Sequence, residues 1–409
     1  MTGGSFLDTF GKGMTTPFLL IYLSEVRDFG PGVAGAVLGA FAATGLVGTL
    51  LGGSLADTRG IRPVLATGLA ITAAGSAVLA FATTAPVAAA AMAIAGLGYG
   101  LARPAVSALV VDVAEHDHLH MAFSATRAAN NLGLGLGALV GGLVAQVSSP
   151  TTFTVLILLD AATSVLFALV AGTIAGAPTR AEPAQSGEAT ASGPSPKPER
   201  TGYRRVLRER TVVGVVLLNA ALVLAGYAVF EAGLGLYAIT DAGVTESGIG
   251  IIFLVNTIAV VVFQLPVARF LEGRARLRYV SAAGVVWALG WLAVLAVGET
   301  LDGIGALAVF ALVAATFALG ECVLPVLSTL VAEVAPAQVR ARALGLIPTS
   351  YALGLTLGPA LVGVLLELSP AALWVAAAAV LGVIALAARG LERAVPAEAR
   401  LTPRSAPAA

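Results

Sequence analysis

The stretch Gly52–Leu65 reads GGSLADTRGIRPVL and joins two long apolar runs of the chain. It places several glycines, an aspartate and two arginines in a short connection between segments that otherwise carry little charge. What this connection does depends on what the apolar runs on either side of it are.

The apolar runs identify the chain as a membrane protein. Of its 409 residues, 58% are hydrophobic and 11% are charged, whereas about a quarter of the residues are charged in soluble domains. Runs of about 20 apolar residues, enough to carry a helix across a hydrocarbon core of about 30 Å, recur along nearly the whole chain. The formal net charge is zero, so no basic field indicates a nucleic-acid partner. The single cysteine, Cys322, excludes an intrachain disulfide framework.

We expect an all-α integral membrane protein with twelve transmembrane helices, because a helix satisfies its own backbone hydrogen bonds in lipid. The first apolar segment lacks a basic start and a small-residue cleavage site, so it predicts a retained helix rather than a signal peptide. The predicted helices span residues 5–26, 32–56, 63–83, 86–110, 121–146, 152–175, 211–238, 248–270, 277–298, 303–331, 343–366 and 371–390.

Basic residues predict the orientation of these helices. Arginines collect after the second, sixth, eighth and tenth helices and in the tail, whereas the opposite connections carry acids and a single basic residue, Arg27. Cytoplasmic loops of membrane proteins hold the basic residues. We therefore expect both termini in the cytoplasm and the protein in the cell (inner) membrane.

The segment Ala177–Glu199 divides the helices six and six. It is rich in Pro, Ala, Ser and Gly, has little to bury, and predicts a disordered linker. The sequence TGYRRVLRER that follows predicts a short basic helix on the anionic inner leaflet. The expected units are an N-terminal six-helix bundle at 1–176, a cytoplasmic linker at 177–210, a C-terminal six-helix bundle at 211–392 and a cytoplasmic tail at 393–409.

An internal repeat relates the two halves. RPAVSALVVDVA, at Arg103–Ala114, aligns with LPVLSTLVAEVA, at Leu324–Ala335, with an offset of 221 residues. The same offset aligns LGLGLGALVGG, at Leu132–Gly142, with LGLTLGPALVG, at Leu353–Gly363, without a gap. Parallel six-helix halves related by an axis along the membrane normal are the plan of major facilitator transporters. The repeat therefore predicts two pseudo-symmetric bundles.

The opening stretch resembles the signature of the major facilitator superfamily in its 2–3 loop, roughly G-x-L-a-D-r-x-G-r-k. The matching residues are Gly53, Leu55, Asp57, Gly60 and Arg62. Arg59 stands one place from the usual basic residue. The resemblance implies that Asp57 faces the positive N-terminus of helix 11, in the other half, and acts as a clasp on the cytoplasmic side.

We expect Arg103, Asp112 and Arg127, toward the cytoplasmic ends of helices 4 and 5, to join Asp57 in this cytoplasmic gate. For the loop arginines Arg59 and Arg62, a role as positive-inside anchors is an equal alternative.

Glycine spacing in helices 5 and 11 resembles the antiporter signature G-x-x-x-G-P-x-x-G-G. In helix 5 the matching residues are Gly133, Gly137, Gly141 and Gly142, and alanine replaces the proline. In helix 11 they are Gly354, Gly358 and Pro359, and valine replaces a glycine. The alternative is packing of small residues between helices without a role in export.

Ionisable residues within the spans are costly and usually functional. Glu321, in helix 10, has no counter-charge among its flanking residues, and desolvation favours its protonated form, so it is the first candidate for proton coupling. Asp8 and Lys12, at i and i+4 of helix 1, suit an ion pair that either locks this helix or takes part in coupling. Asp160 and Glu231 are further candidates, with hydrogen-bonded packing as the alternative for each.

Asn256 and Gln264 lie two turns apart on one face of helix 8 and predict neutral polar contacts in a substrate cavity, together with Lys12. The three tryptophans, Trp287, Trp291 and Trp374, either line a cavity or lie at the membrane interface, and we expect the interface.

The stretch EHDHLH, at Glu115–His120, alternates histidines with other residues. This spacing does not converge ligands on a metal, so we expect no metal site there.

The stretch NTIAVVVFQLPVARFLEGRAR, at Asn256–Arg276, resembles, with the helix 1 pattern and GEC in helix 10, the proton-coupled drug exporter branch. The resemblance implies an alternating-access carrier that exchanges inward-moving protons for an outgoing small amphipathic compound. Such a carrier uses the proton gradient, needs no cofactor and is expected to be a monomer. An importer or facilitator of a small metabolite is the alternative on the same scaffold. A membrane-embedded enzyme is disfavoured, because the spans contain no catalytic triad, zinc motif or phosphate-binding loop.

Overall fold

The computed structural model describes residues 2–113, 119–173, 206, 208–336 and 339–402. The predicted linker at 177–199 and most of the basic segment after it lie outside these residues, as do His116 and His118.

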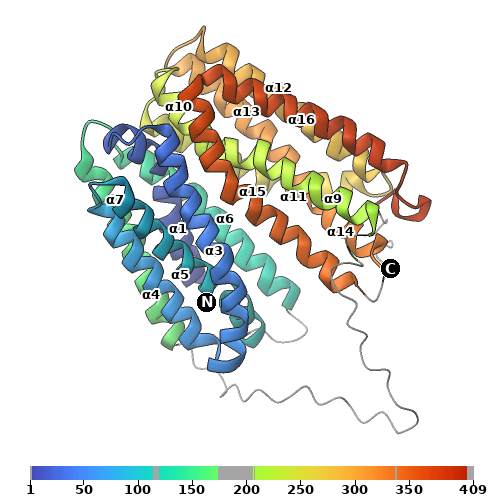
Figure 1. Cartoon of the computed structure of the whole chain (residues 1–409), viewed down its shortest axis with the longest axis horizontal. Helices are drawn as coiled ribbons and strands as arrows, with labels where there is room; N and C mark the ends of the chain where they lie inside the picture. Colours follow the sequence, from blue (N-terminus) through green and yellow to red (C-terminus); the bar gives the residue numbers. More distant parts are fainter. Residues whose placement is uncertain (1, 114–118, 174–205, 207, 337–338, 403–409) are drawn as a thin grey trace.

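The twelve predicted spans are present as helices or as runs of helical segments (Figure 1). Those of the N-terminal half are α1 (Thr2–Thr15) continued by α2 (Leu19–Ile21), α3 (Pro31–Arg59), α4 (Ile61–Ala80), α5 (Ala85–Val113), α6 (Leu119–Val144) and α7 (Pro150–Thr173). Those of the C-terminal half are α9 (Arg210–Leu222) continued by α10 (Leu234–Thr240), α11 (Glu246–Leu271), α12 (Arg276–Gly298), α13 (Ile304–Val323) continued by α14 (Pro325–Val334), α15 (Arg340–Leu368) and α16 (Pro370–Glu392). Among the described residues, ten of these spans are individually long and apolar enough to cross a membrane.

Three spans are interrupted where the apolar pattern predicts continuous helices. Pro17 lies in a 3₁₀ turn of the first span, because proline lacks an N–H and blocks the preceding helical turn. A single residue, Leu324, separates the end of α13 from Pro325, which begins α14. The seventh span contains two π-helical turns, Val223–Tyr227 and Val229–Gly233. Turns of this kind frequently mark functional sites.

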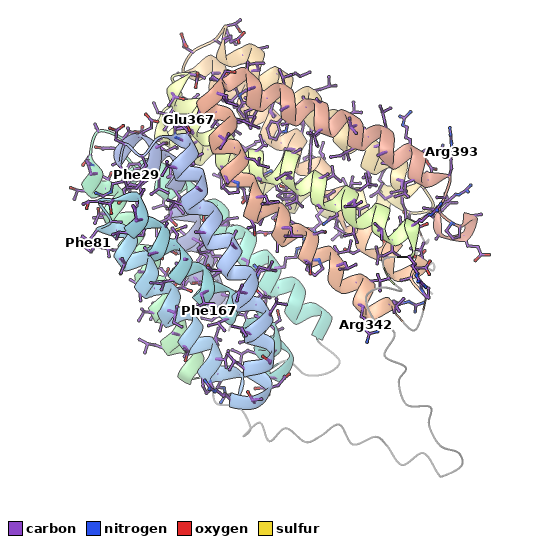
Figure 2. The ribbon with its side chains drawn as sticks, viewed as in Figure 1. Phe29, Phe81, Phe167, Arg342, Glu367 and Arg393 are labelled. Atoms are coloured by element: carbon purple, nitrogen blue, oxygen red, sulfur yellow. The ribbon has the colours of Figure 1, made fainter. Side chains whose placement is uncertain are left out.

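The two halves form two bundles that lie side by side (Figure 1). We call the end that carries the arginine-rich connections the basic end and the opposite end the acidic end. Arg342 and Arg393 lie toward the basic end, and Phe29 and Glu367 lie toward the acidic end (Figure 2). Across the two halves, α3 packs against α15 and α6 packs against α11.

Repeat-related glycines make related contacts within each half. Gly133, Gly137 and Gly141 of α6 lie directly against the backbone of α1. Gly354 and Gly358 of α15 lie against the side chains of Val223 and Ala228 of the seventh span. Each glycine allows an approach that a Cβ atom would block. The fifth and eleventh helices are therefore seated on the first helix of their own half.

A second pair of glycines forms contacts between the halves at the acidic end. Gly142 of α6 lies against the carbonyl of Glu246, the first residue of α11. Its repeat equivalent, Gly363 of α15, lies against the carbonyl of Pro31, the first residue of α3. The acidic end is therefore closed by two equivalent seams between helices of opposite halves.

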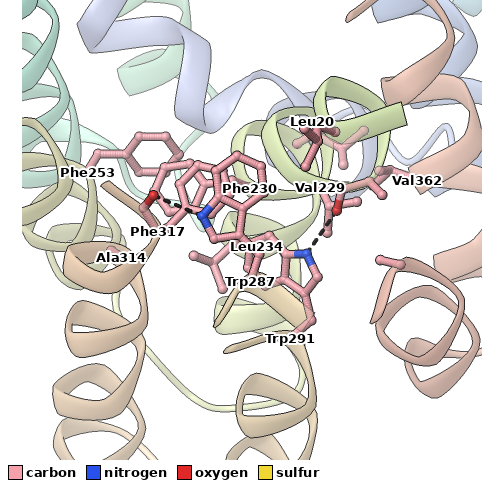
Figure 3. Packing of buried hydrophobic residues seen from close by; sticks show 14 of the residues in the cluster. Leu20, Val229, Phe230, Leu234, Phe253, Trp287, Trp291, Ala314, Phe317 and Val362 are labelled. Atoms are coloured by element: carbon pink, nitrogen blue, oxygen red, sulfur yellow. Dashed lines mark hydrogen bonds between the residues drawn. The ribbon is translucent and has the colours of Figure 1, made fainter. Parts of the chain in front are cut away.

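The aromatic core of the C-terminal half corrects the prediction for the tryptophans, which was wrong. Trp287, Trp291 and Trp374 are at most 2% exposed. The indole nitrogen of Trp287 donates to the carbonyl of Phe317 at 3.0 Å, and that of Trp291 donates to the carbonyl of Ala225 at 2.9 Å (Figure 3). Ala225 lies in a π turn, whose backbone pattern differs from that of an α-helix. For Trp287 and Trp291, backbone acceptors inside the bundle thus replace the water that an interfacial tryptophan uses, whereas Nε1 of Trp374 is buried without a hydrogen-bond partner among the described residues.

The described part of the predicted tail folds back on the basic end of the C-terminal half. A 3₁₀ turn, Ala397–Ala399, precedes residues that pair with the connection between α11 and α12. The backbone N–H of Thr402 donates to the carbonyl of Arg274, and that of Arg276 donates to the carbonyl of Arg400, each at 3.0 Å. The sequence does not predict this arrangement, because the paired residues lie far apart along the chain.

Candidate functional site

A cavity of about 260 Å³ lies between the two halves. One wall comes from α6, and the others come from the seventh span, α11, α13, α14 and α15. Its polar and ionisable lining residues are Arg127, Asn131, Tyr227, Glu231, Asn256, Thr257, Gln264, Glu321, Cys322 and Tyr351. Residues that the sequence singles out on four separate helices thus surround one space.

Two carboxylates face this cavity, and each lies at or near a helix interruption. Glu231 is in the second π turn of the seventh span, and Glu321 is three residues before Leu324, where α13 gives way to α14. Among the described residues, neither carboxylate forms an ion pair. Asn256 lines the same cavity, and its Nδ2 donates to the carbonyl of Ala314 at 3.3 Å. Carboxyl groups held away from water without a direct counter-ion can exchange protons when their surroundings change.

Aromatic side chains that the sequence reading missed complete the wall. Tyr227 meets Tyr351 edge-on with ring centroids 5.6 Å apart, and Phe230 lies 5.0 Å from Phe253. All four line the cavity. The sequence could have identified Tyr227 by its spacing, because it precedes Glu231 by four residues and residues four apart share a helix face. Flat apolar groups can bind against such rings.

Arg127 lies in the cavity and apart from the other predicted gate residues. It shares a face of α6 with Asn131, four residues later, which also lines the cavity. Since α6 begins at Leu119, Arg127 is eight residues into the helix, or about 12 Å along its axis. That rise carries its side chain away from the connection near Asp112 and into the space between the halves.

The motif residues at the end of α3 are exposed in this conformation. Asp57 and Arg59 lie in its last turn, and Gly60 ends the helix with a φ of 91°, which favours glycine. Gly53 faces open space. Within the described residues Asp57 forms no ion pair. Its clasp with helix 11 stays a prediction, for a conformation closed at the basic end.

Two ion pairs at the basic end occupy equivalent places in the repeat. Arg62, at the start of α4, pairs with Asp112 of α5 at 3.7 Å between Nη2 and Oδ2. Glu333 follows Asp112 by 221 residues and pairs with Arg276 at 2.5 Å. Arg276 is only 1% exposed, and its Nε and Nη1 atoms have no hydrogen-bond partner in the structure. Arg276 is therefore the more buried of the two arginines, whereas the Glu333 side chain, 36% exposed, is more exposed than that of Asp112 at 22%.

This difference predicts unequal stability losses. We expect Glu333→Ala to lower the free energy of unfolding by about 2–3 kcal/mol, because it leaves the buried Arg276 guanidinium without a counter-charge. Asp112→Ala is the matched control and should cost about 0–1 kcal/mol, since its pair is longer and partly exposed. Denaturant unfolding of both purified variants in one detergent measures this. Equal losses would contradict the assignment.

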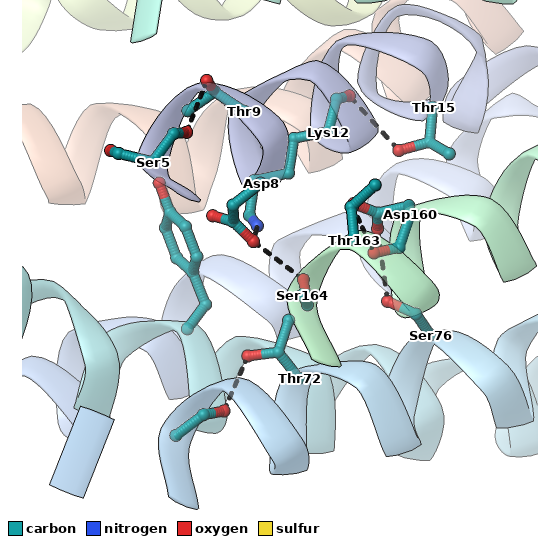
Figure 4. A network of polar contacts seen from close by, with 12 residues as sticks. Ser5, Asp8, Thr9, Lys12, Thr15, Thr72, Ser76, Asp160, Thr163 and Ser164 are labelled. Carbon is teal, nitrogen blue, oxygen red and sulfur yellow. Dashed lines mark hydrogen bonds and ion pairs between the residues drawn. The ribbon is translucent and has the colours of Figure 1, made fainter. Parts of the chain in front are cut away.

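A second polar cluster lies inside the N-terminal half. Lys12 pairs with Asp8 at 2.5 Å between Nζ and Oδ1, and Ser164 donates to the same Asp8 oxygen at 2.8 Å (Figure 4). Ser76 of α4 donates to Oδ2 of Asp160 at 3.5 Å. Lys12, expected in the substrate cavity, belongs to this cluster, which does not line the cavity described above.

Arg103, another predicted gate residue, donates to the hydroxyl of Tyr99 at 2.9 Å. The Lys12 ammonium lies 5.4 Å from the centre of the same ring, so Tyr99 connects this arginine to the N-terminal cluster.

Comparisons with known proteins give one family match and several relatives. The family described as Major Facilitator Superfamily matches residues 1–243 and 216–408. The uncharacterized MFS-type transporter YqjV of Bacillus subtilis (strain 168) is 24% identical over 323 residues, which cover 78% of this chain and 74% of YqjV. The quinolone resistance protein NorA of Staphylococcus aureus is 26% identical over 148 residues, 36% of this chain and 38% of NorA. The similarity to NorA thus spans well under half of that relative.

Solved structures resemble the chain over nearly its whole length. The nucleoside transporter NupG superposes with a TM-score of 0.73 at 17% identity, covering 95% of this chain and 97% of NupG. A D-xylose-proton symporter superposes with a TM-score of 0.71 at 16% identity, covering 98% of each chain. At these identities the likeness concerns the fold alone.

Proposed function

The chain belongs to the major facilitator superfamily of multi-pass membrane transporters, and we propose that it is a secondary active transporter exporting a small amphipathic compound in exchange for protons. The observation that carries this proposal is the cavity between the halves, where Glu231 and Glu321 lie among aromatic side chains on interrupted helices. The partial similarity to NorA supports the direction of transport. The proton gradient supplies the energy, and the protein acts as a monomer without a cofactor.

The chemistry of the cavity supports an amphipathic substrate. Tyr227, Phe230, Phe253 and Tyr351 offer flat apolar surfaces. Two carboxylates against the single guanidinium of Arg127 leave an excess of acid, which favours a compound with a positive group. Such a compound and protons compete for the same carboxylates, so that one is released when the other binds. This competition couples the two fluxes in opposite directions.

The closed acidic end supports a conformation that receives substrate from the basic end. The seams at Gly142 and Gly363 shut the acidic end, while Asp57 and Gly53 at the basic end face open surroundings. The positive-inside pattern assigns the basic end to the cytoplasm, with the protein in the cell (inner) membrane and both termini on the cytoplasmic side. The compound then enters from the cytoplasm and leaves when the two bundles rock to open the acidic end.

Inside-out vesicles that contain the protein test this function. An imposed pH gradient, acidic inside, should drive a fluorescent lipophilic cation into these vesicles and not into vesicles lacking the protein. A proton ionophore should collapse the accumulated gradient of the dye. Flux of the cation that does not respond to the pH gradient would end the antiporter proposal.

An importer or facilitator of a small metabolite is the second candidate. It is favoured by three amide side chains in the cavity, Asn131, Asn256 and Gln264, which suit hydroxylated compounds. In the same vesicles, a facilitator would equilibrate a metabolite without a pH gradient and would not concentrate the cation.

A further inference from the structure

The polar cluster inside the N-terminal half contains two acids and one base. We call Asp8, Lys12, Ser76, Asp160 and Ser164 the N-half cluster. Asp8 and Asp160 are both less than 9% exposed. With all three ionisable groups charged, the cluster would hold an uncompensated negative charge away from water. Burying such a charge is costly, so the structure needs a compensating partner.

The two carboxylates of the N-half cluster are satisfied very differently. A single oxygen of Asp8, Oδ1, accepts hydrogen bonds from the Lys12 ammonium at 2.5 Å and from the Ser164 hydroxyl at 2.8 Å. Among the described residues, the Asp160 carboxylate accepts a hydrogen bond only from the Ser76 hydroxyl, at 3.5 Å, which is the outer limit of a hydrogen bond. Its Oδ1 is buried and has no hydrogen-bond partner in the structure. The uncompensated charge therefore belongs to Asp160.

The close approach of α1 limits what can bind at this orphan oxygen. Gly11 of α1 lies so near that a Cβ atom there would stand 3.1 Å from Oδ1 of Asp160 and would overlap the hydroxyl of Thr163 (Figure 4). A metal ion needs several oxygen ligands around it at more than about 2 Å. The backbone of α1 occupies the space for such a shell, whereas a proton needs none.

No other described side chain supplies a second positive charge. The charged groups on the elements packed against α7 are Asp8 and Lys12 of α1, Arg62 of α4, Arg127 of α6 and Glu25 at the end of the first span. Arg62 pairs with Asp112 at the basic end, and Arg127 lines the cavity. Two arginines outside these elements bond tyrosine hydroxyls instead of the acids: Arg103 donates to Tyr99 and Arg27 donates to Tyr22. Lys12 therefore stands alone between two acids.

We propose that Asp160 is a second proton-binding site, separate from the substrate cavity, which holds a proton of its own while Asp8 and Lys12 remain an ion pair. This inference rests on the proposed function for its consequence, which is that each exported compound is exchanged for one more proton than the cavity carboxylates carry. Asp8 and Gly11 belong to α1, whereas Ser164 and Asp160 belong to α7. A shift of α1 relative to α7 therefore changes both the Ser164–Asp8 bond and the cover over Asp160.

Infrared spectroscopy of the purified protein tests the site without any transport. Wild-type protein at neutral pH should show the carbonyl band of a protonated carboxyl group, and Asp160→Asn should remove a part of it equal to one group. Glu321→Gln should leave this part in place, and Asp302→Asn, at an exposed loop position, is the matched control. Asp160→Glu keeps a carboxyl and should shift the band rather than remove it. An unchanged band in Asp160→Asn would overturn the proposal.

The choice of ligand and the transport consequence have separate readouts. Replacing choline by sodium in the buffer should leave the band unchanged, and its loss would mean that sodium is the ligand instead. In vesicles, Asp160→Asn should lower the limiting accumulation of the cation about tenfold for each pH unit of the gradient, because one coupled proton is lost. A wild-type protein without proton-driven transport would defeat the proposed function while leaving the infrared result standing. Unchanged accumulation in Asp160→Asn would overturn the coupling role of the second site.

Discussion

Glu321→Gln will lower the limiting proton-driven accumulation of the cation about tenfold for each pH unit of the gradient, because one coupled proton is lost, while exchange of labelled for unlabelled substrate continues. Glutamine is close in size to glutamate and keeps a hydrogen-bonding group in the cavity that Asn256 also lines. It cannot bind or release a proton, so the cavity loses one of the protons that tie substrate movement to the gradient. The substrate can still bind to the aromatic side chains and to the remaining carboxylate of Glu231, so it continues to cross the membrane by exchange.

Matched variants separate this effect from general damage. Glu299→Gln changes an exposed carboxylate at the end of α12 and should leave both readouts unchanged. Glu231→Gln tests the other cavity carboxylate under the same conditions. Uphill accumulation by Glu321→Gln at the wild-type rate would remove Glu321 from the mechanism.

Gly142→Leu will abolish transport by holding the acidic end open. Even a Cβ atom at this position would stand 3.0 Å from backbone atoms of Gly250, and the carbonyl of Glu246 lies closer still. A leucine adds three more carbon atoms to a seam where two helix backbones meet. Overpacking of this kind forces the backbones apart. The conformation closed at the acidic end is therefore lost, and alternating access stops.

The native cysteine offers a direct readout of this change. Cys322 lines the cavity and is the single cysteine of the chain. In Gly142→Leu, a membrane-impermeant maleimide added on the acidic side should label Cys322 faster than in the wild type. Gly172→Ala is the control, because Gly172 has nothing within 4 Å of the added carbon. Wild-type labelling and transport in Gly142→Leu would show that the seam is not a gate.

The local pattern of the sequence is sufficient for the spans and the repeat. Apolar runs encode helix length, so the predicted span 277–298 differs from α12, Arg276–Gly298, by one residue. Gly142 and Gly363 are separated by the same offset of 221 residues and lie in equivalent seams. An insertion within either half would have changed this offset and disturbed the packing. Residue type and spacing are enough for features that depend on neighbours along the chain.

Features that depend on how helices are rotated and interrupted could not be predicted in this way. Arg127 faces the cavity because of its rise along α6, and the charge pattern alone groups it with Asp112. Trp291 is buried because a π turn presents the carbonyl of Ala225, and no sequence motif encodes that turn. Asp160 and Glu321 look alike in the sequence as isolated acids in apolar helices, yet they lie in different places with different partners.

The glycine seams of the acidic end bring backbone against backbone at Gly142 and Gly363. Each seam also holds one glutamate that forms no ion pair among the described residues: Glu246 accepts from the backbone N–H of Val147 at 2.8 Å, and the Glu367 carboxylate lies against Gly32. Attraction across such a surface comes from many weak dispersion contacts with no preferred direction. Added salt should therefore change the closing of this end very little. The thickness of the bilayer and the lateral pressure of its lipid tails act directly on the helices of these seams, which can move relative to one another. The resting position of the carrier should accordingly follow the bilayer that surrounds it.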